Sequence, residues 1–213
     1  VAAGTTNSSI FEGHLTPALT DAFVAWFSVG GVLDGAAVYG GSSGEIANGV
    51  AIGADGSAYL VGNTASGDAP GVMPTAGLSG VRAMLVKYRP DHTRAWTRFV
   101  GSGQETFADV AIGTGGIFVA GTTESASVEG QTSHGANDII LARYKPGGAR
   151  VWLHLVGSAN FESADGIALG PGGTLYVAGS MAGGNKGVTS PPGKLDTFAA
   201  LYRFNAIGVP LSE

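Results

Sequence analysis

The sequence predicts an all-β fold built from a repeated unit of short antiparallel strands. Three observations lead to this prediction: the composition, a sequence repeat, and the alternation of short apolar runs with glycine-rich turns. The 213-residue chain contains 37 glycines and 9 prolines, and only 13% of its residues are charged. Such a chain is rich in turn-forming residues and poor in the alanine, glutamate, lysine and leucine stretches that sustain helices. Strands are therefore the expected secondary structure.

A repeat runs through the whole chain. The segment EIANGVAIGADGSAYLVGN at 45–63 closely resembles ESADGIALGPGGTLYVAGS at 162–180. A glycine that follows an apolar run recurs every 58 or 59 residues, at Gly4, Gly62, Gly121 and Gly179. A fixed period of this kind indicates a fold assembled from similar structural units.

Each period contains four short apolar runs, named A, B, C and D in chain order. Runs of this length that are rich in valine, isoleucine and aromatic residues, and bounded by Gly, Pro or Asp, are typical of strands. The sequence predicts strand A over 49–52, 110–112 and 166–169, strand B over 58–61, 117–120 and 175–178, strand C over 22–27, 83–88, 138–144 and 197–202, and strand D over 95–100 and 151–156.

The connections between the runs favour antiparallel pairing. A is joined to B by GADGS, GTGG or GPGG, and C is joined to D by RPDHTR or KPGGAR, all of which suit tight hairpins. A longer polar connection with little repeated sequence joins B to C. Four-stranded antiparallel units repeated head to tail are typical of the blades of a β-propeller. A solenoid of stacked β-arcs is the structural alternative, although solenoid repeats are usually only about 20–30 residues long.

One four-stranded sheet cannot bury both of its faces, so each predicted blade must pack against its neighbours. The aromatic positions, including Trp96 and Trp152, are interpreted as part of this packing. A single domain over 1–213 is predicted, with repeats at approximately 1–46, 47–107, 108–163 and 164–213. This gives about four blades, the first of them incomplete because it starts at strand B. We therefore expect a part of a larger ring, or an assembly subunit that associates with a second copy through exposed blade edges.

The segments ADGIALGPGGTLYVAGS at 164–180 and DTFAALYRFNAIG at 196–208 resemble the bacterial β-propeller repeat known as the SBBP repeat. The pattern of that repeat is A-x-G-[IV]-A-[VL]-D-x-x-G-x-[VL]-Y-V-x-G-[ST], followed by D-A-F-V-[AV]-[KR]-[YL]. The resemblance extends over essentially the whole chain. It departs at Arg82, where the other repeats have Asp21, Asp138 and Asp196, before Val110, where a glycine is lost, and in SVGGVLDGAAVY at 28–39. The resemblance implies an exported or surface-attached protein and supplies no catalytic residue.

Composition also argues against several classes of function. The net charge is −5 and no cluster of Lys or Arg occurs, which argues against a nucleic-acid partner. The chain has no cysteine, so disulfides and thiolate chemistry are excluded. The most apolar run, 22–33, is too short and too interrupted to span a membrane.

Acidic and amide side chains recur in the connection from strand D to the next strand A. These candidate binding residues are Glu45, Asn48, Glu105, Asp109, Glu162 and Asp165. The connection lies at the same end of a blade as the B–C loop, whereas Arg89, His92, Arg94, Lys145 and Arg150 belong to the hairpins at the other end. The sequence thus predicts one acidic end and one basic end. Asn48, Asp109 and Asp165 carry oxygen ligands of the kind that Ca²⁺ prefers; the alternative is that they bond to backbone groups at the entry to strand A.

We expect a non-catalytic module that serves as a scaffold or a recognition surface, located outside the cell, on its surface or in the periplasm. No catalytic residue, resident metal or other cofactor is expected. A protein or glycan partner is expected to contact the long B–C loops at 63–80, 122–137 and 180–195. One alternative is a glycan-directed lyase or hydrolase that uses the acidic end, which requires two carboxylates about 5–10 Å apart. A lectin is a further alternative, although no aromatic residue recurs in the B–C loops.

Overall fold

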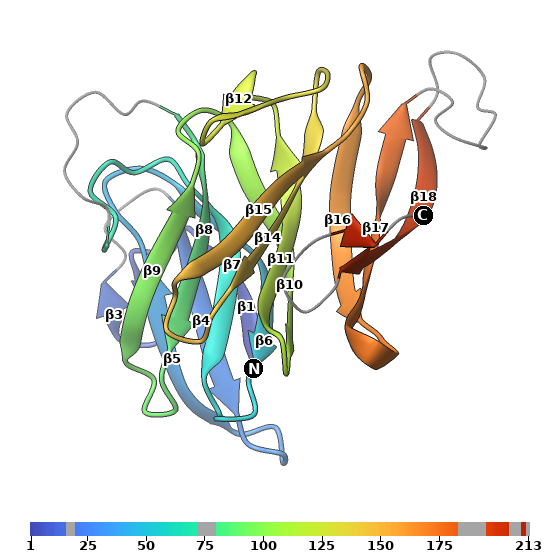
Figure 1. The fold of residues 1–213 in the computed structure, drawn as a ribbon. Coiled ribbons are helices and arrows are strands. Elements are labelled where there is room, and N and C mark those ends of the chain that lie inside the picture. Colours follow the sequence, from blue (N-terminus) through green and yellow to red (C-terminus); the bar gives the residue numbers. More distant parts are fainter. Residues whose placement is uncertain (16–19, 72–79, 183–194, 205–209, 212–213) are drawn as a thin grey trace. The chain divides into compact units, whose positions relative to one another are not determined.

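The computed structural model describes residues 1–15, 20–71, 80–182, 195–204 and 210–211, with side chains over 1–13, 20–71 and 80–182. The prediction of an all-β fold with antiparallel sheets is confirmed (Figure 1). Across this part of the chain the one helical element is η1, a 3-10 turn over Pro171–Gly173, and no helix is long and apolar enough to cross a membrane.

Four main sheets follow one another along the chain, and consecutive strands pair as neighbours, B to D in the first sheet and A to D in the other three. The first, three-stranded sheet consists of β1 (Ala2–Thr6), β4 (Asp21–Phe27) and β5 (Leu33–Tyr39). The second consists of β6 (Glu45–Ile52), β7 (Ala58–Thr64), β8 (Arg82–Tyr88) and β9 (Arg94–Val100). The third consists of β10 (Glu105–Gly113), β11 (Gly116–Thr123), β14 (Asp138–Tyr144) and β15 (Arg150–Val156). The fourth consists of β16 (Glu162–Leu169), β17 (Thr174–Ala182), β18 (Leu195–Phe204) and β19 (Pro210–Leu211).

Two B–C loops carry small hairpins of their own. These hairpins are β2 (Ile10–Phe11) with β3 (His14–Leu15), and β12 (Ser127–Val128) with β13 (Gln131–Thr132). Of the predicted B–C loops, the one at 122–137 lies wholly within the described residues, whereas 72–79 and 183–194 of the other two lie outside them.

The inner strands begin earlier than the apolar pattern predicts. Strand A was expected to start at Gly49 and Gly166, but β6 starts at Glu45 and β16 at Glu162. In both strands the register with strand B shifts at the residue before that glycine, Asn48 in β6 and Asp165 in β16. A bulge of this kind interrupts the alternation of side chains that marks a strand in the sequence.

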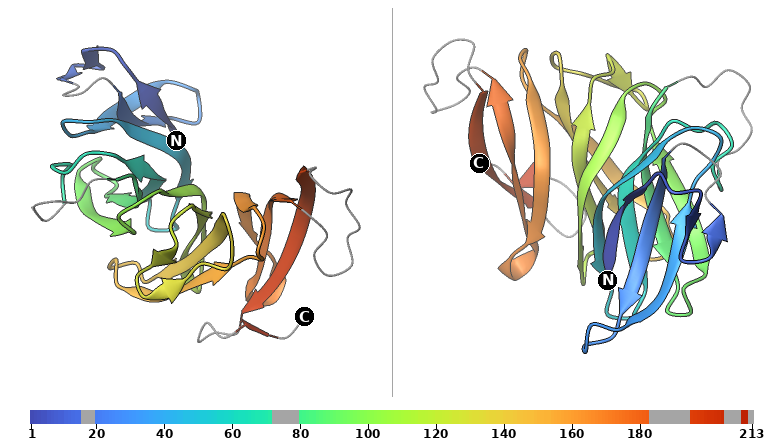
Figure 2. Two further views of the ribbon diagram at one scale, coloured as in Figure 1. Left: turned by 90° about the horizontal axis from the view of Figure 1, so that it is seen from above. Right: turned by 180° about the vertical axis from the view of Figure 1, so that it is seen from behind.

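The chain forms two compact units, Val1–Phe107 and Ala108–Glu213, which divide within β10. In the first unit, Val24 and Trp26 of the first sheet share a core with Leu60 and Met84 of the second sheet. In the second unit, the third and fourth sheets pack together in the same way. Figure 2 shows the sheets of each unit facing one another. Sheet-on-sheet packing thus supplies the core within each unit, as the sequence predicts.

The recurring glycine of strand B lies where strand B approaches the bulge of strand A. A Cβ atom on Gly62 would be 1.8 Å from the carbonyl oxygen of Ile46, and one on Gly179 would be 1.9 Å from that of Ser163. Both obstacles are backbone atoms, which cannot rotate away as a side chain can. At Gly62 and Gly179 the repeated glycine therefore reflects a steric requirement of the bulge.

We predict that Gly62→Ala lowers the free energy of unfolding by about 3 kcal/mol, because the added methyl group overpacks a backbone contact. Urea titration followed by circular dichroism measures this loss. Gly67→Ala is the matched control, since nothing lies within 4 Å of a Cβ at that exposed position. Equal stability of the two variants would contradict the steric explanation.

Candidate functional site

The three glutamates predicted as binding residues are buried at the start of strand A. Glu45, Glu105 and Glu162 are exposed by only 0%, 1% and 2%. Each carboxylate accepts a hydrogen bond from a backbone N–H of the preceding D–A turn. The donors are Gly41 at 2.8 Å, Gly103 at 3.0 Å and Ser158 at 2.9 Å, respectively.

The backbone of the same glutamates makes a second repeated contact. The N–H groups of Glu45, Glu105 and Glu162 donate to the carbonyl oxygen of the residue that precedes strand C of the earlier repeat. The acceptors are Thr20 at 3.0 Å, Val81 at 3.2 Å and Asn137 at 3.0 Å. Each glutamate therefore holds its own turn through the side chain and the end of an earlier B–C loop through the backbone. We call this paired contact the glutamate latch.

The other predicted site residues lie farther along strand A. Asn48 is exposed on the bulge of β6, and its amide donates to the carbonyl oxygen of Phe107 at 2.8 Å. Asp109 follows Glu105 by one residue more than Asn48 follows Glu45. Its carboxylate accepts a hydrogen bond from the N–H of Ile167 at 3.0 Å. Asp165, on the bulge of β16, is exposed. Two of these three residues thus bond to backbone groups of a following strand A, as the structural alternative proposes.

These residues do not form a metal-binding cluster. Within the part of the chain that the structure describes, no group of three or more His, Asp or Glu side chains is arranged to hold a metal ion. The expectation of a calcium site therefore gains no support from the geometry.

Arg82 shows how one repeat manages without the aspartate that opens strand C. In the third sheet, the Asp138 carboxylate accepts from the backbone N–H of His134 at 2.7 Å and so ties down the B–C loop. In the second sheet, Arg82 donates from Nη2 to the carbonyl oxygen of Ser66 at 2.7 Å, and its guanidinium lies 5.1 Å from the Phe99 ring. The loop is still held, but with donor and acceptor exchanged.

The described B–C loop at 122–137 lies along the edge of the outermost strand. The Gln131 side chain donates to the carbonyl oxygen of Leu153 at 2.7 Å and accepts from the N–H of Leu155 at 3.3 Å, both in β15. In the same loop, Glu129 pairs with Arg150. This loop therefore brings an acidic side chain to a basic residue of the opposite end, and the predicted separation of charge is incomplete there.

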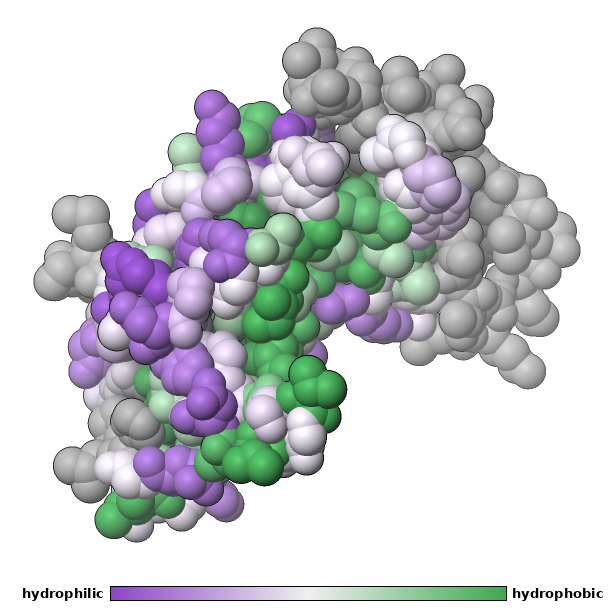
Figure 3. All heavy atoms as spheres, turned by 90° about the horizontal axis from the view of Figure 1, so that it is seen from below, coloured by the Kyte–Doolittle hydropathy of each residue, from purple (hydrophilic) through white to green (hydrophobic). Residues whose placement is uncertain are grey.

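The hairpin ends of the sheets expose apolar side chains beside the predicted basic ones. Val29 and Val32 lie in the β4–β5 hairpin, Ile52 ends β6 and Val151 lies near the start of β15; all four are at least 39% exposed. Figure 3 looks at the chain from below and shows apolar side chains at the surface next to hydrophilic ones. The hairpin ends also carry Asp34, Asp55 and Asp91 beside the basic residues, so the predicted separation of charge is incomplete there as well.

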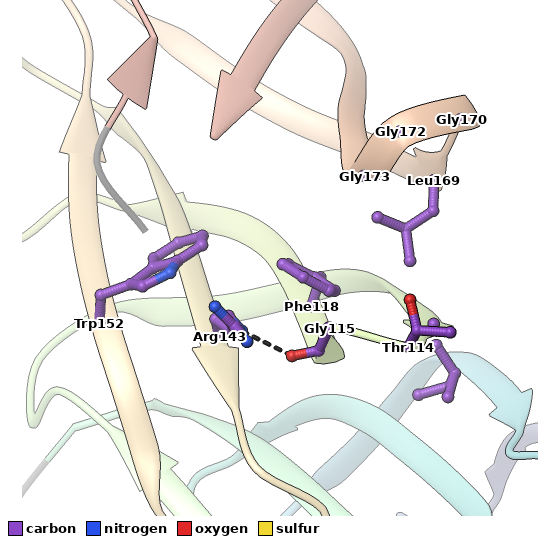
Figure 4. A pocket seen from close by; sticks show the side chains of 11 residues that line it. Thr114, Gly115, Phe118, Arg143, Trp152, Leu169, Gly170, Gly172 and Gly173 are labelled. Carbon is purple, nitrogen blue, oxygen red and sulfur yellow. Dashed lines mark hydrogen bonds between the residues drawn. The ribbon is translucent and has the colours of Figure 1, made fainter. Parts of the chain in front are cut away.

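A pocket of about 610 Å³ lies between the third and fourth sheets of the second unit, at the hairpin end. Figure 4 shows Trp152, Arg143 and Phe118 on one side of it, opposite Leu169 and the glycines of η1. The Arg143 guanidinium donates from Nε to the carbonyl oxygen of Gly115 at 2.7 Å and lies 5.7 Å from the centre of the Phe118 ring. No acidic side chain is among the described residues that line the pocket. A pocket lined by two aromatic rings and one fixed cation is suited to binding a small molecule.

The residues of this pocket were not predicted from the sequence as a site. Trp152 was interpreted as packing, and it does pack against the core of the second unit. The feature that marks the pocket is a row of residues across three strands. In this row, Arg143 of β14 pairs with Phe118 of β11 on one side and with Trp152 of β15 on the other. Such a row becomes visible only once the register of three strands is known.

No protein-family model matches this chain, and no curated protein matches it significantly. The resemblance to the SBBP repeat therefore stays a prediction.

Glu45 gives the latch a dependence on pH. Burial raises the pKa of Glu45 above its ordinary value of 4.5, although hydrogen bonds from Ser66, Thr64 and Gly41 oppose this shift. Because the folded state holds the proton more tightly, the contribution of Glu45 to stability is fully present below pH 4.5 and is lost as pH rises through the raised pKa.

We predict that the stability difference between wild type and Glu45→Gln is largest in acid and shrinks toward neutral pH, because glutamine does not titrate. The change amounts to about 1.4 kcal/mol for each unit by which the pKa of Glu45 is raised. Urea unfolding of both proteins from acidic to neutral pH measures this change. A difference that stays constant with pH would contradict the prediction.

Proposed function

We propose that this chain is a non-catalytic, extracytoplasmic β-propeller module that acts as a scaffold for assembly and recognition. The observation that carries the proposal is the glutamate latch, which occurs three times with backbone partners in the same two segments, the D–A turn and the end of the earlier B–C loop. It ties each strand A to an earlier B–C loop, as a regular succession of blades requires. The extracytoplasmic location is supported by the resemblance to the SBBP repeat.

Burial of the glutamates favours the scaffold over the glycan-directed enzyme. A general acid or nucleophile must touch the substrate, whereas Glu45, Glu105 and Glu162 are at most 2% exposed and already accept backbone hydrogen bonds. These carboxylates are therefore better suited to holding turns than to glycoside chemistry.

An assembly surface is supported by the open face of the fourth sheet. In the third sheet, Phe118 and Ala120 lie against the fourth sheet and are exposed by 8% and 0%. Tyr176 and Ala178 occupy the equivalent positions of strand B in the fourth sheet. Tyr176, however, is 45% exposed, and Ala178 is also exposed. We call the face that carries Tyr176, Ala178 and the exposed Asp165 the open face.

The pattern of the open face fits a further sheet of the same kind. The equivalent face of the third sheet offers the Asp109 carboxylate and the Thr122 hydroxyl to backbone N–H groups of the sheet that covers it, Ile167 at 3.0 Å and Ala164 at 3.3 Å. The open face offers Asp165 and Ser180 at its corresponding end. The proposed occupant is therefore a sheet of a second copy of this chain.

We predict that the wild-type chain self-associates as its concentration rises, and that Tyr176→Asp weakens this association by about tenfold or more, as expected for an aromatic residue at the centre of an interface. Sedimentation velocity over a concentration series measures both effects. Val29→Asp, an equally drastic change at an exposed valine outside the open face, is the control and leaves association unchanged. A wild-type chain that stays monomeric throughout would rule out self-assembly through the open face.

A further inference from the structure

Three hairpins between strands C and D have the same backbone arrangement. In each turn, the N–H of the first residue donates to the carbonyl oxygen of the fifth residue at 2.8 Å. The pairs are Ser28 with Val32, Arg89 with Thr93, and Lys145 with Ala149. The fourth residue has a positive φ in every case and donates back to the carbonyl oxygen of the first; these residues are Gly31, His92 and Gly148. The side chains of the three turns can therefore be compared position by position.

The β4–β5 turn differs from the other two in the character of its side chains. The β8–β9 and β14–β15 turns carry Arg or Lys at both ends, at Arg89 and Arg94 and at Lys145 and Arg150. The β4–β5 turn has Ser28 and Leu33 at these positions, and no charged residue occurs from 27 to 33. Val29 is fully exposed, Val32 is 68% exposed, and Phe27 and Leu33 are exposed as well. We call residues 27–33 the apolar tip.

The apolar tip is convex and its backbone is well ordered. Within the first unit, the β4–β5 hairpin reaches beyond the turns of the second sheet, both from the front (Figure 1) and from behind (Figure 2). The hydroxyl oxygen of Ser28 accepts a further hydrogen bond from the N–H of Val32 at 3.2 Å. The hydrogen-bonded turn therefore presents Val29 and Val32 to solvent in a fixed arrangement.

The base of the apolar tip is polar and contains charges of both signs. The neighbouring β8–β9 hairpin lies against it, because the ring of His92 stacks on Trp26 with the centroids 4.2 Å apart. His92 Nε2 also lies 3.5 Å from Oδ2 of Asp34. The exposed charged residues of these two hairpins are Arg89, Arg94, Asp34 and Asp91. An uncharged tip thus rises from a rim on which positive and negative side chains balance.

An exposed apolar patch with a polar rim is typical of a contact with a protein or with a membrane. Hot spots of protein interfaces are enriched in Trp, Tyr and Arg that fill pockets, whereas Val and Leu are under-represented. The apolar tip offers two valines and a leucine on a convex surface. A fluid bilayer receives such a shape without a matching cavity, and zwitterionic headgroups carry both of the charges found on the rim. These features favour a lipid surface.

We propose that the apolar tip inserts into the interface of a phospholipid bilayer. Val29 and Val32 enter the boundary between headgroups and acyl chains, while Arg89 and Asp91 stay among the headgroups. The binding is peripheral and reversible, because two valines carry fewer carbon atoms than one acyl chain, which is itself a marginal anchor. The inference goes beyond the proposed scaffold role and does not depend on it.

Flotation of the whole chain with phosphatidylcholine vesicles at millimolar lipid tests the proposal. We expect part of the wild-type chain to float with the vesicles. Val29→Asp should lower the affinity for vesicles by about tenfold or more, since it replaces a buried valine by a charge. Val151→Asp is the matched control, because it makes the same change at an exposed valine of another C–D hairpin, and it should leave flotation unchanged. Added phosphatidylglycerol should change the affinity little, because the charges of the rim balance.

A fluorescent probe reports whether the apolar tip itself enters the lipid. The chain contains no cysteine, so Val32→Cys can be labelled at a single position with nitrobenzoxadiazole, whose fluorescence rises in apolar surroundings. Ala149→Cys carries the label at the equivalent position of the β14–β15 turn. We expect vesicles to raise the fluorescence of the label at 32 and not at 149. Adding Val29→Asp to Val32→Cys should weaken this response by about tenfold or more, with the circular dichroism spectrum unchanged.

Several results would overturn the proposal. One is the absence of both flotation and a fluorescence change at position 32, as expected if the apolar tip contacts another protein. Equal flotation of wild type and folded Val29→Asp would exclude the tip as the contact. Binding only to vesicles with phosphatidylglycerol, lost in salt, would assign the contact to charge. A fluorescence rise at position 32 with protein concentration and without vesicles would make a second copy the occupant.

Discussion

The structure depends on the burial of a carboxylate at the start of each inner strand. A glutamate removed from water is costly unless its oxygens are hydrogen-bonded, and here backbone N–H groups of the D–A turn provide these bonds. The turn must therefore come close, and it does so through glycine: a Cβ atom on Gly101 would lie 1.9 Å from Oε2 of Glu105. The glycines that end strand D therefore leave the space that the buried carboxylates occupy.

This constraint explains which features recur from repeat to repeat and which vary. The glutamate and the glycine opposite the bulge recur because each meets backbone atoms, which have no freedom to move, whereas the glycine that ends strand D recurs beside a buried carboxylate. The residue that opens strand C varies: Asp138 accepts from a backbone N–H and Arg82 donates to a backbone carbonyl oxygen, so equivalent loops are held with opposite chemistry. The chain thus keeps a common backbone arrangement while the turns at the hairpin ends change.

Most of the strand order could be predicted from the sequence, because short apolar runs separated by glycine turns leave few other arrangements. The starts of β6 and β16 could not be predicted, since the bulges at Asn48 and Asp165 break the alternation. The acidic residues were correctly placed near the D–A turns, but composition alone could not show that the glutamates point inward. The pocket could not be predicted, because Phe118, Arg143 and Trp152 come together only through the register of three strands.

Gln131 has a consequence for the behaviour of this protein in solution. Outer strands expose unpaired N–H and C=O groups, which can recruit strands of other molecules and start aggregation. By bonding to Leu153 and Leu155, the amide of Gln131 acts as a short substitute for a neighbouring strand. A loop that varies freely in sequence can therefore still protect the molecule against fibril growth, provided that it delivers one amide group to the rim of β15.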